Sequence, residues 1–200
     1  MKNFTLSVLF LFAMLNISFA QEKEKRQEVG INFTSLNNFG VTYKVGTSKN
    51  LWRFNILAIN FNNSKDEETN IQQQVHENYN RGAGISIGKE FRKVITKNLE
   101  FRYGFDVAFN YNWYKNINKN NNDYYESERT IYTPSLIGVI GANYVFSENL
   151  AFGVELLPRF SYRTGKNRIV NGGVETKGDI SGFGFNLNND VARLSLSYRF

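Results

Sequence analysis

The feature that most constrains this chain is the segment 99–113, in which apolar and polar side chains alternate strictly. Its odd positions are all apolar or aromatic: Leu99, Phe101, Tyr103, Phe105, Val107, Phe109, Tyr111 and Trp113. Its even positions hold charged, amide and small residues: Glu100, Arg102, Gly104, Asp106, Ala108, Asn110 and Asn112. A period of two produces a strand with one apolar and one polar face, and strands of soluble sheets average only about five or six residues. The segment therefore predicts a tilted strand that crosses a membrane.

The length of this segment suits a bilayer. Ten residue steps from Phe101 to Tyr111 span about 33 Å at ~3.3 Å per residue. Tilted by ~40°, this stretch rises about 25 Å, which is the height of the lipid-facing band of a membrane barrel. No apolar run approaches the ~20 residues that a membrane-spanning helix needs, apart from the shorter one at the N-terminus. Strands are therefore the predicted spanning elements.

Weaker alternation recurs along the rest of the chain. It predicts eight strands, at residues 28–35, 38–46, 50–61, 79–92, 98–114, 130–146, 149–164 and 181–200. The segments 51–61 and 131–146 are apolar on both faces in places, which predicts bulges or close packing of small residues. The predicted fold class is all-β: a transmembrane antiparallel up-and-down β-barrel of about eight strands.

The connections between these strands are of two kinds. Short ones at 46–50, 93–98 and 147–149 end in the related tripeptides Lys49-Asn50-Leu51, Lys97-Asn98-Leu99 and Glu148-Asn149-Leu150. Long polar ones are predicted as loops at 62–78, 115–130 and 165–180. Short turns at one end and long loops at the other are typical of bacterial outer-membrane barrels.

The N-terminus has the pattern of a secretory signal peptide. Residues 1–20 combine Lys2, an apolar stretch and the small residues Ser18 and Ala20 before a plausible cleavage point. The alternative is an uncleaved membrane anchor, but the apolar stretch is short for a span. We expect residues 21–27 to form a short charged periplasmic segment and residues 28–200 to form the barrel.

The C-terminal strand carries a family resemblance. Apolar residues fall at every second position in Leu194, Leu196, Tyr198 and Phe200. This pattern resembles the signal by which the outer-membrane assembly machinery recognises its substrates; the alternative is an ordinary edge strand of a soluble protein. Residues 28–200 resemble the small eight-stranded outer-membrane barrels of the OmpA-like and OmpX-like class, within the porin-like outer membrane proteins, and the Asn-rich loops look like Bacteroidetes members. The resemblance implies the bacterial outer membrane as location, with its lipid, lipopolysaccharide and assembly machinery as partners.

The polar faces of the strands predict a charge network inside the barrel. Its expected members are Arg53, Glu90, Arg92, Glu100, Arg102, Asp106, Glu155, Arg159, Arg163 and Arg193, with Lys44 and Arg199 on the same face. An eight-stranded barrel is just wide enough for side chains to fill it, and unpaired buried charges are costly. We therefore expect salt bridges in the lumen in place of a wide pore, with a narrow or gated conductance as the alternative.

The long loops are the predicted functional surface. Trp113, Tyr114, Tyr124 and Tyr125 stand beside an Asn-rich run and offer rings and amides to an extracellular glycan or protein. The alternative is that these loops only solvate the cell surface.

Residues for catalysis, cofactors or metals do not form a recognisable set. The chain has no Cys, and its single histidine, His76, falls in a predicted loop without a Ser or acid in a catalytic pattern. The net charge of +6 is spread along the chain without a basic block, which argues against nucleic-acid binding. We expect a structural, adhesive or surface-interaction protein without catalysis. The alternatives are a narrow porin-like channel or transport component, a lipid A-modifying enzyme, and a soluble lipocalin-like barrel with residues 101–113 facing inward.

Overall fold

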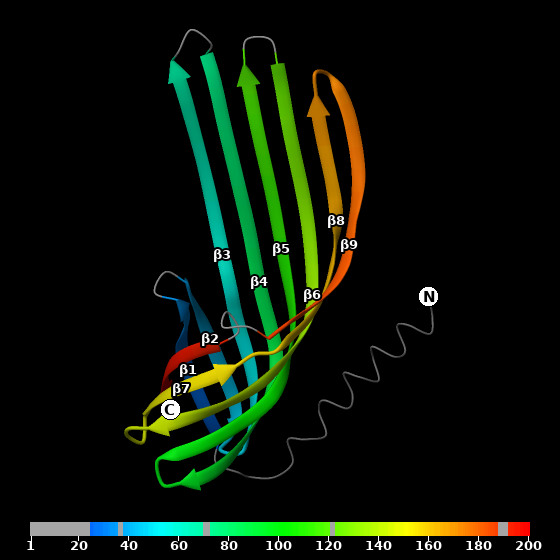
Figure 1. Ribbon diagram of the computed structural model, residues 1–200. Helices are drawn as coiled ribbons and strands as arrows, with labels where there is room; N and C mark the ends of the chain where they lie inside the picture. The colour runs from blue at the N-terminus through cyan, green and yellow to red at the C-terminus, as the bar shows by residue number, and fades with distance from the viewer. Residues whose placement is uncertain (1–24, 36–37, 70–72, 121–122, 188–191) are drawn as a thin grey trace.

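The computed structural model describes residues 25–35, 38–69, 73–120, 123–187 and 192–200 (Figure 1). The predicted signal peptide lies outside these residues, as does most of the predicted charged segment 21–27. The described part consists of ten antiparallel strands, and none of it forms a helix that could cross a membrane. The all-β, antiparallel part of the prediction is therefore confirmed.

The strands vary widely in length. They are β1 (Lys25–Ser35), β2 (Asn38–Thr47), β3 (Asn50–Thr69), β4 (Gln73–Thr96), β5 (Leu99–Asn120), β6 (Asp123–Val145), β7 (Leu150–Leu156), β8 (Arg159–Asn171), β9 (Val174–Asn186) and β10 (Ala192–Arg199). The three short connections fall where the sequence predicts them, between β2 and β3, β4 and β5, and β6 and β7.

The strand pairings close into a circuit. Strands β1 to β6 pair in sequence order, β6 pairs with β7, β7 with β10, and β10 with β1. We call this circuit the ring; it forms the lower part of the molecule in Figure 1. Strand β6 also pairs with β8 through residues 125–137, beyond its contact with β7, and β8 pairs with β9.

The described residues thus contain ten strands where the sequence predicts about eight. The predicted strand 149–164 is divided into β7 and β8 at Leu157 and Pro158, because proline has no backbone N–H to donate to the sheet. The predicted strand 181–200 is covered by the end of β9 and by β10, with residues 188–191 outside the description.

The prediction of three long loops is wrong, because the segments 62–78, 115–130 and 165–180 are largely strand. Pairing continues to Thr69 opposite Gln73, to Asn120 opposite Asp123, and to Asn171 opposite Val174. The three hairpins rise side by side from the ring (Figure 1). We call this extension the wall; it comprises residues 62–69, 73–80, 113–120, 123–130, 165–171 and 174–180. Both of its faces are polar, so the segments lack the apolar alternation that reveals a strand.

The ring is apolar outside and polar inside. Each strand of the circuit exposes apolar side chains on the outer surface: Ile31, Val41, Phe54, Ile87, Phe105, Ile140, Val154 and Leu196 are examples. Phe105 is 51% exposed, whereas Arg53, Glu90 and Arg102 on the inner surface are completely buried. This excludes the lipocalin-like alternative, in which the aromatic face of β5 would point inward. An outward apolar band around a charged interior is the pattern of lipid-facing strands.

The unequal strand heights leave two free sheet edges. Strand β2 pairs with β3 only up to Ile56, so among the described strands the rest of β3 has β4 as its one partner. Strand β9 likewise pairs only with β8 among them. The wall is therefore an open sheet of β3, β4, β5, β6, β8 and β9 standing on a closed ring.

Candidate functional site

The centre of the ring is an ion-pair cluster around Glu90. Its carboxylate lies 2.8 Å from Lys44 Nζ, 2.9 Å from Arg53 Nη1 and 2.6 Å from Arg92 Nε. Arg53 also bridges to Glu155, with Nη2 3.1 Å from its carboxylate. All five side chains are buried, and they come from β2, β3, β4 and β7. One cluster therefore ties strands from opposite sides of the ring together.

A second cluster lies toward the end of the ring away from the wall. Glu28 lies 2.6 Å from Arg92 Nη2 and 3.1 Å from Arg199 Nε, and Glu100 lies 2.6 Å from Arg199 Nη2. Arg26 contacts both carboxylates, at 2.9 Å from Glu28 and 3.5 Å from Glu100. Because Arg92 also contacts Glu90, the two clusters form one continuous network.

Eight of the ten predicted lumen residues belong to this network: Arg53, Glu90, Arg92, Glu100, Arg102, Asp106, Glu155 and Arg193. Arg159 and Arg163 do not, because their strand β8 leaves the ring beyond Pro158. Two members were not predicted, Glu28 and Arg26. Arg26 precedes the predicted start of the barrel at residue 28. Glu28 lies on the polar face of the alternation that Val29, Ile31 and Phe33 define, so that pattern could have identified it.

An apolar layer lies above the ion pairs, on the side of the wall. Ala108, Ile137, Val139 and Leu157 are buried against one another and against Leu57. Inward-facing Leu57, Ile137 and Val139 explain why the segments 51–61 and 131–146 are apolar on both faces. The predicted bulge in the first of these lies between Ile56 and Ala58. Ion pairs and this layer together fill the lumen at the level of the outer apolar band.

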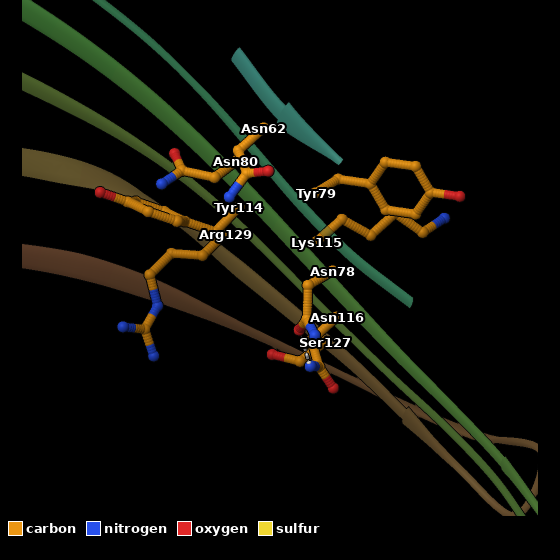
Figure 2. A pocket seen from close by; sticks show the side chains of 9 residues that line it. All are labelled: Asn62, Asn78, Tyr79, Asn80, Tyr114, Lys115, Asn116, Ser127 and Arg129. Atoms are coloured by element: carbon orange, nitrogen blue, oxygen red, sulfur yellow. Dashed lines mark hydrogen bonds between the residues drawn. The ribbon is translucent and has the colours of Figure 1, made fainter. Parts of the chain in front are cut away.

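The inner face of the wall continues the polar side of the ring and carries a hollow of about 400 Å³ (Figure 2). It is lined by Asn62, Asn78, Tyr79, Asn80, Tyr114, Lys115, Asn116, Ser127 and Arg129. Figure 2 shows the side chains of Tyr79 and Lys115 pointing away, to the opposite face of the sheet. Amides, one phenol, one serine hydroxyl and one guanidinium therefore make up the polar groups on the inner side.

The outer face of the wall holds a dense set of ion pairs. The Glu126 carboxylate lies 3.2 Å from Lys115 Nζ and 2.6 Å from Arg168 Nη1, and it accepts a hydrogen bond from the Tyr124 hydroxyl. That hydrogen bond, with help from Lys115 and Arg168 and against partial burial, lowers the pKa of Glu126 from its usual 4.5. The carboxyl group is therefore ionised at neutral pH and holds β5, β6 and β8 together.

The four predicted surface aromatics divide between the two faces. Tyr114 lines the inner hollow, and strand alternation places Tyr125 on the same face as Arg129. Trp113 lies on the outer face, where its Nε1 donates to Glu128 at 2.8 Å and Arg81 stacks over its ring at 5.1 Å. Tyr124 also lies there, bound to Glu126. These four residues are therefore not one site.

His76 lies at the top of the inner face, and its Nδ1 is 2.6 Å from the Asn118 side-chain oxygen. Among the described residues, no group of His, Asp and Glu is arranged to hold a metal ion.

A closed ring with an apolar exterior and a charged, filled interior defines the class of bacterial outer-membrane barrel proteins. No family model matches the chain, and no curated protein matches its sequence. Among solved structures, a major outer membrane protein of Thermus thermophilus is similar in fold, with a TM-score of 0.52 and 11% identity over 88% of this chain and 99% of that one. CarO of Acinetobacter baumannii aligns with 9% identity over 88% of this chain and 96% of that one, at a TM-score of only 0.32. The likeness to the first agrees with the predicted outer-membrane location.

Proposed function

We propose that this protein is a β-barrel of the OmpA-like and OmpX-like kind, whose ring spans the outer membrane and whose wall stands outside the cell. Its role is structural, adhesive or surface-interacting, and it does not catalyse a reaction. Lipid and lipopolysaccharide surround the ring, and the outer-membrane assembly machinery inserts it through the β10 pattern of Leu194, Leu196 and Tyr198.

The observation that carries this proposal is the wall itself. Six strands continue beyond the apolar band as a hydrogen-bonded sheet that is polar on both faces. Membrane spanning does not require this extension, and a sheet displays side chains in a more defined arrangement than a loop does. We infer that the wall presents a surface to something outside the cell.

The filled lumen argues against the alternative of a channel. A steady current needs a continuous aqueous path, whereas Arg53, Glu90 and Arg102 are fully buried across the ring. Against the lipid A-modifying alternative, His76 contacts the amide of Asn118, and within the described ranges no serine or carboxylate binds its ring.

Cysteine labelling of intact cells tests the topology, because the native chain contains no Cys. Thr176→Cys lies near the wall tip, and Glu148→Cys lies in the turn between β6 and β7 at the opposite end. A membrane-impermeant maleimide should label the first and not the second. The reverse pattern, or equal labelling, would contradict the proposed orientation.

A chain with its three wall hairpins shortened tests the role. The shortened chain should keep heat-modifiable migration on a gel, and neither chain should give steady current in planar bilayers. Cells carrying the intact chain should attach better than cells carrying the shortened one to at least one of a panel of protein-coated and polysaccharide-coated surfaces. Equal attachment throughout would remove the surface-interaction role, and a steady current would favour the channel.

A further inference from the structure

We propose that the inner hollow of the wall binds a negatively charged oligosaccharide from outside the cell. This inference rests on the proposed function, since it requires the wall to stand in the extracellular space. It adds a site and a ligand class: a chain of sugars that carries carboxylate, sulfate or phosphate groups.

The first argument is unused hydrogen-bonding capacity. Asn78 and Asn116 bind each other, and Asn80 accepts from Asn60 at 3.3 Å. Asn62, Tyr114 and Arg129 line the same hollow without a hydrogen-bond partner among the described residues, and all three are exposed. A concave site with several convergent polar groups is the usual form of a ligand site.

The second argument is charge. Strand alternation places Arg159, Arg163 and Arg129 along the inner side of β8 and β6, rising from the ion-pair network toward the tip. Asp106 lies in the ring and Asp66 near the tip of the wall. At the heights between these two residues, the described inner-facing positions of the strands hold no Asp or Glu. Neither Arg129 nor Arg163 has an ion-pair partner in the described structure. The inner face therefore carries uncompensated positive charge.

The outer face of the wall differs from the inner face, because most of its cations are paired with carboxylates. There Lys115 and Arg168 share Glu126, Lys177 pairs with Glu175 at 3.1 Å, and Lys119 lies 3.6 Å from Glu77. Lys115, Lys119, Arg168 and Lys177 on the outer face thus have carboxylate partners within the sheet, and Lys166 is an exception. On the inner face, Arg129 and Arg163 have no such partner among the described residues. The guanidinium groups on the inner face thus remain available for an anionic ligand.

The chemistry of the lining favours a sugar over a protein. Asparagine both donates and accepts hydrogen bonds, as a hydroxyl group does, so a row of amides matches a row of sugar hydroxyls. The hollow has no aliphatic residue among its described lining, whereas a protein partner is normally anchored by apolar and aromatic side chains at the centre of its interface.

The position of the hollow makes the lipid of the same membrane an unsuitable ligand. The inner face continues the lumen side of the ring. Tyr79 and Lys115 point to the opposite side (Figure 2), which strand alternation places in line with the lipid-facing side chains such as Phe105. A ligand in the hollow therefore comes from the extracellular space.

Titration calorimetry on the purified, detergent-solubilised full chain tests the proposal. The probes are tetragalacturonate, a sulfated heparin-derived tetrasaccharide, and neutral maltotetraose. Arg129→Gln and Arg163→Gln each remove one inner-face charge. The matched control, Lys166→Gln, removes one charge from the outer face of β8, opposite Thr130 on β6. Heat-modifiable migration of each variant shows that its barrel is intact.

At least one anionic probe should bind more tightly than maltotetraose, and Arg129→Gln should weaken it roughly tenfold or more, because a hydrogen bond to a charged group is lost. Lys166→Gln should leave the affinity unchanged. Absence of binding by both anionic probes, equal binding of maltotetraose, or an equal loss in Lys166→Gln would each overturn the inference. If Thr176→Cys is labelled on intact cells, none of these outcomes affects the proposed function. If Thr176→Cys is not labelled, the proposed function itself is wrong.

Discussion

The ring and the wall are built from the same long strands, yet they handle charge in opposite ways. In the ring, β4 and β5 turn Glu90, Arg92 and Arg102 inward and leave the outside apolar. In the wall, β5 and β6 place Lys115 and Glu126 outward, while the inner side carries amides and arginines that have no ion-pair partner in the part of the chain that the structure describes. Hydrocarbon around the ring excludes charge from its outer face, whereas water on both sides of the wall permits it. The comparison teaches that one strand can pass from lipid to water by changing its outer face from apolar to charged while its inner face stays polar.

The largest expected difference between the two regions comes from removing a buried carboxylate. Glu90→Gln leaves Lys44, Arg53 and Arg92 facing one another without their central partner, which should lower the free energy of unfolding by about 3–5 kcal/mol. Denaturant unfolding in lipid vesicles measures the change. Glu175→Gln is the control, because this exposed residue of the wall should have no measurable effect; equal losses would contradict the distinction.

The next effect concerns the solvent around each region, which is lipid around the ring and water around the wall. Phe105→Arg places a charge in the apolar band of the ring and should destabilise the folded barrel by about 2–4 kcal/mol. Val174→Arg makes a similar change at the wall tip and should be neutral, since Val174 faces water. Unfolding in vesicles again provides the measurement. Equal tolerance of arginine at both positions would show that the ring does not face lipid.

A smaller loss of stability is expected when a glycine that lies against a neighbouring backbone is replaced by alanine. A methyl group on Gly104 of the ring would overlap the backbone oxygen of Lys89, so Gly104→Ala should cost about 1–3 kcal/mol. Gly178 in the wall has no atom within 4 Å of the same added group, and Gly178→Ala should be neutral or slightly stabilising. A loss at Gly178 as large as that at Gly104 would mean that the wall is packed as tightly as the ring.

The smallest effect is a pH dependence on the outer face of the wall. Because the folded-state pKa of Glu126 is lowered, its stabilising contribution is complete above its usual pKa of 4.5 and is lost as the pH falls through the lower folded value. Tyr124→Phe removes the hydroxyl that donates to this carboxylate and should raise the pKa of Glu126 toward 4.5. A carbon-13 NMR titration of the carboxyl group measures it. Tyr125→Phe should leave it unchanged, and an equal shift would contradict the assignment.

Much of the ring could be predicted because its faces differ sharply. The alternation around Phe105 identified the outer face of β5, and with it the inward Arg102 and Asp106. The predicted barrel began at residue 28 and therefore omitted Arg26, whereas β1 in the structure begins at Lys25.

The wall could not be predicted in the same way. Its strands are held by pairing with neighbouring strands, and a sequence with polar residues on both faces does not reveal pairing. The hollow depends on register, which brings Asn62 opposite Asn80, Asn80 opposite Tyr114, and Tyr114 opposite Arg129. These residues are far apart in the chain, and only Tyr114 was a candidate from the sequence.

The open edges of the wall bear on how the protein avoids association with other chains. An unpaired strand is a template on which another chain can add a strand, and proteins prevent this with charges along the edge. The free edge of β3 carries Lys65, Asp66 and Glu67 in succession, and charged residues of this kind discourage the addition of a further strand. The charges on β3 therefore oppose the extension of the wall into a larger sheet at this edge.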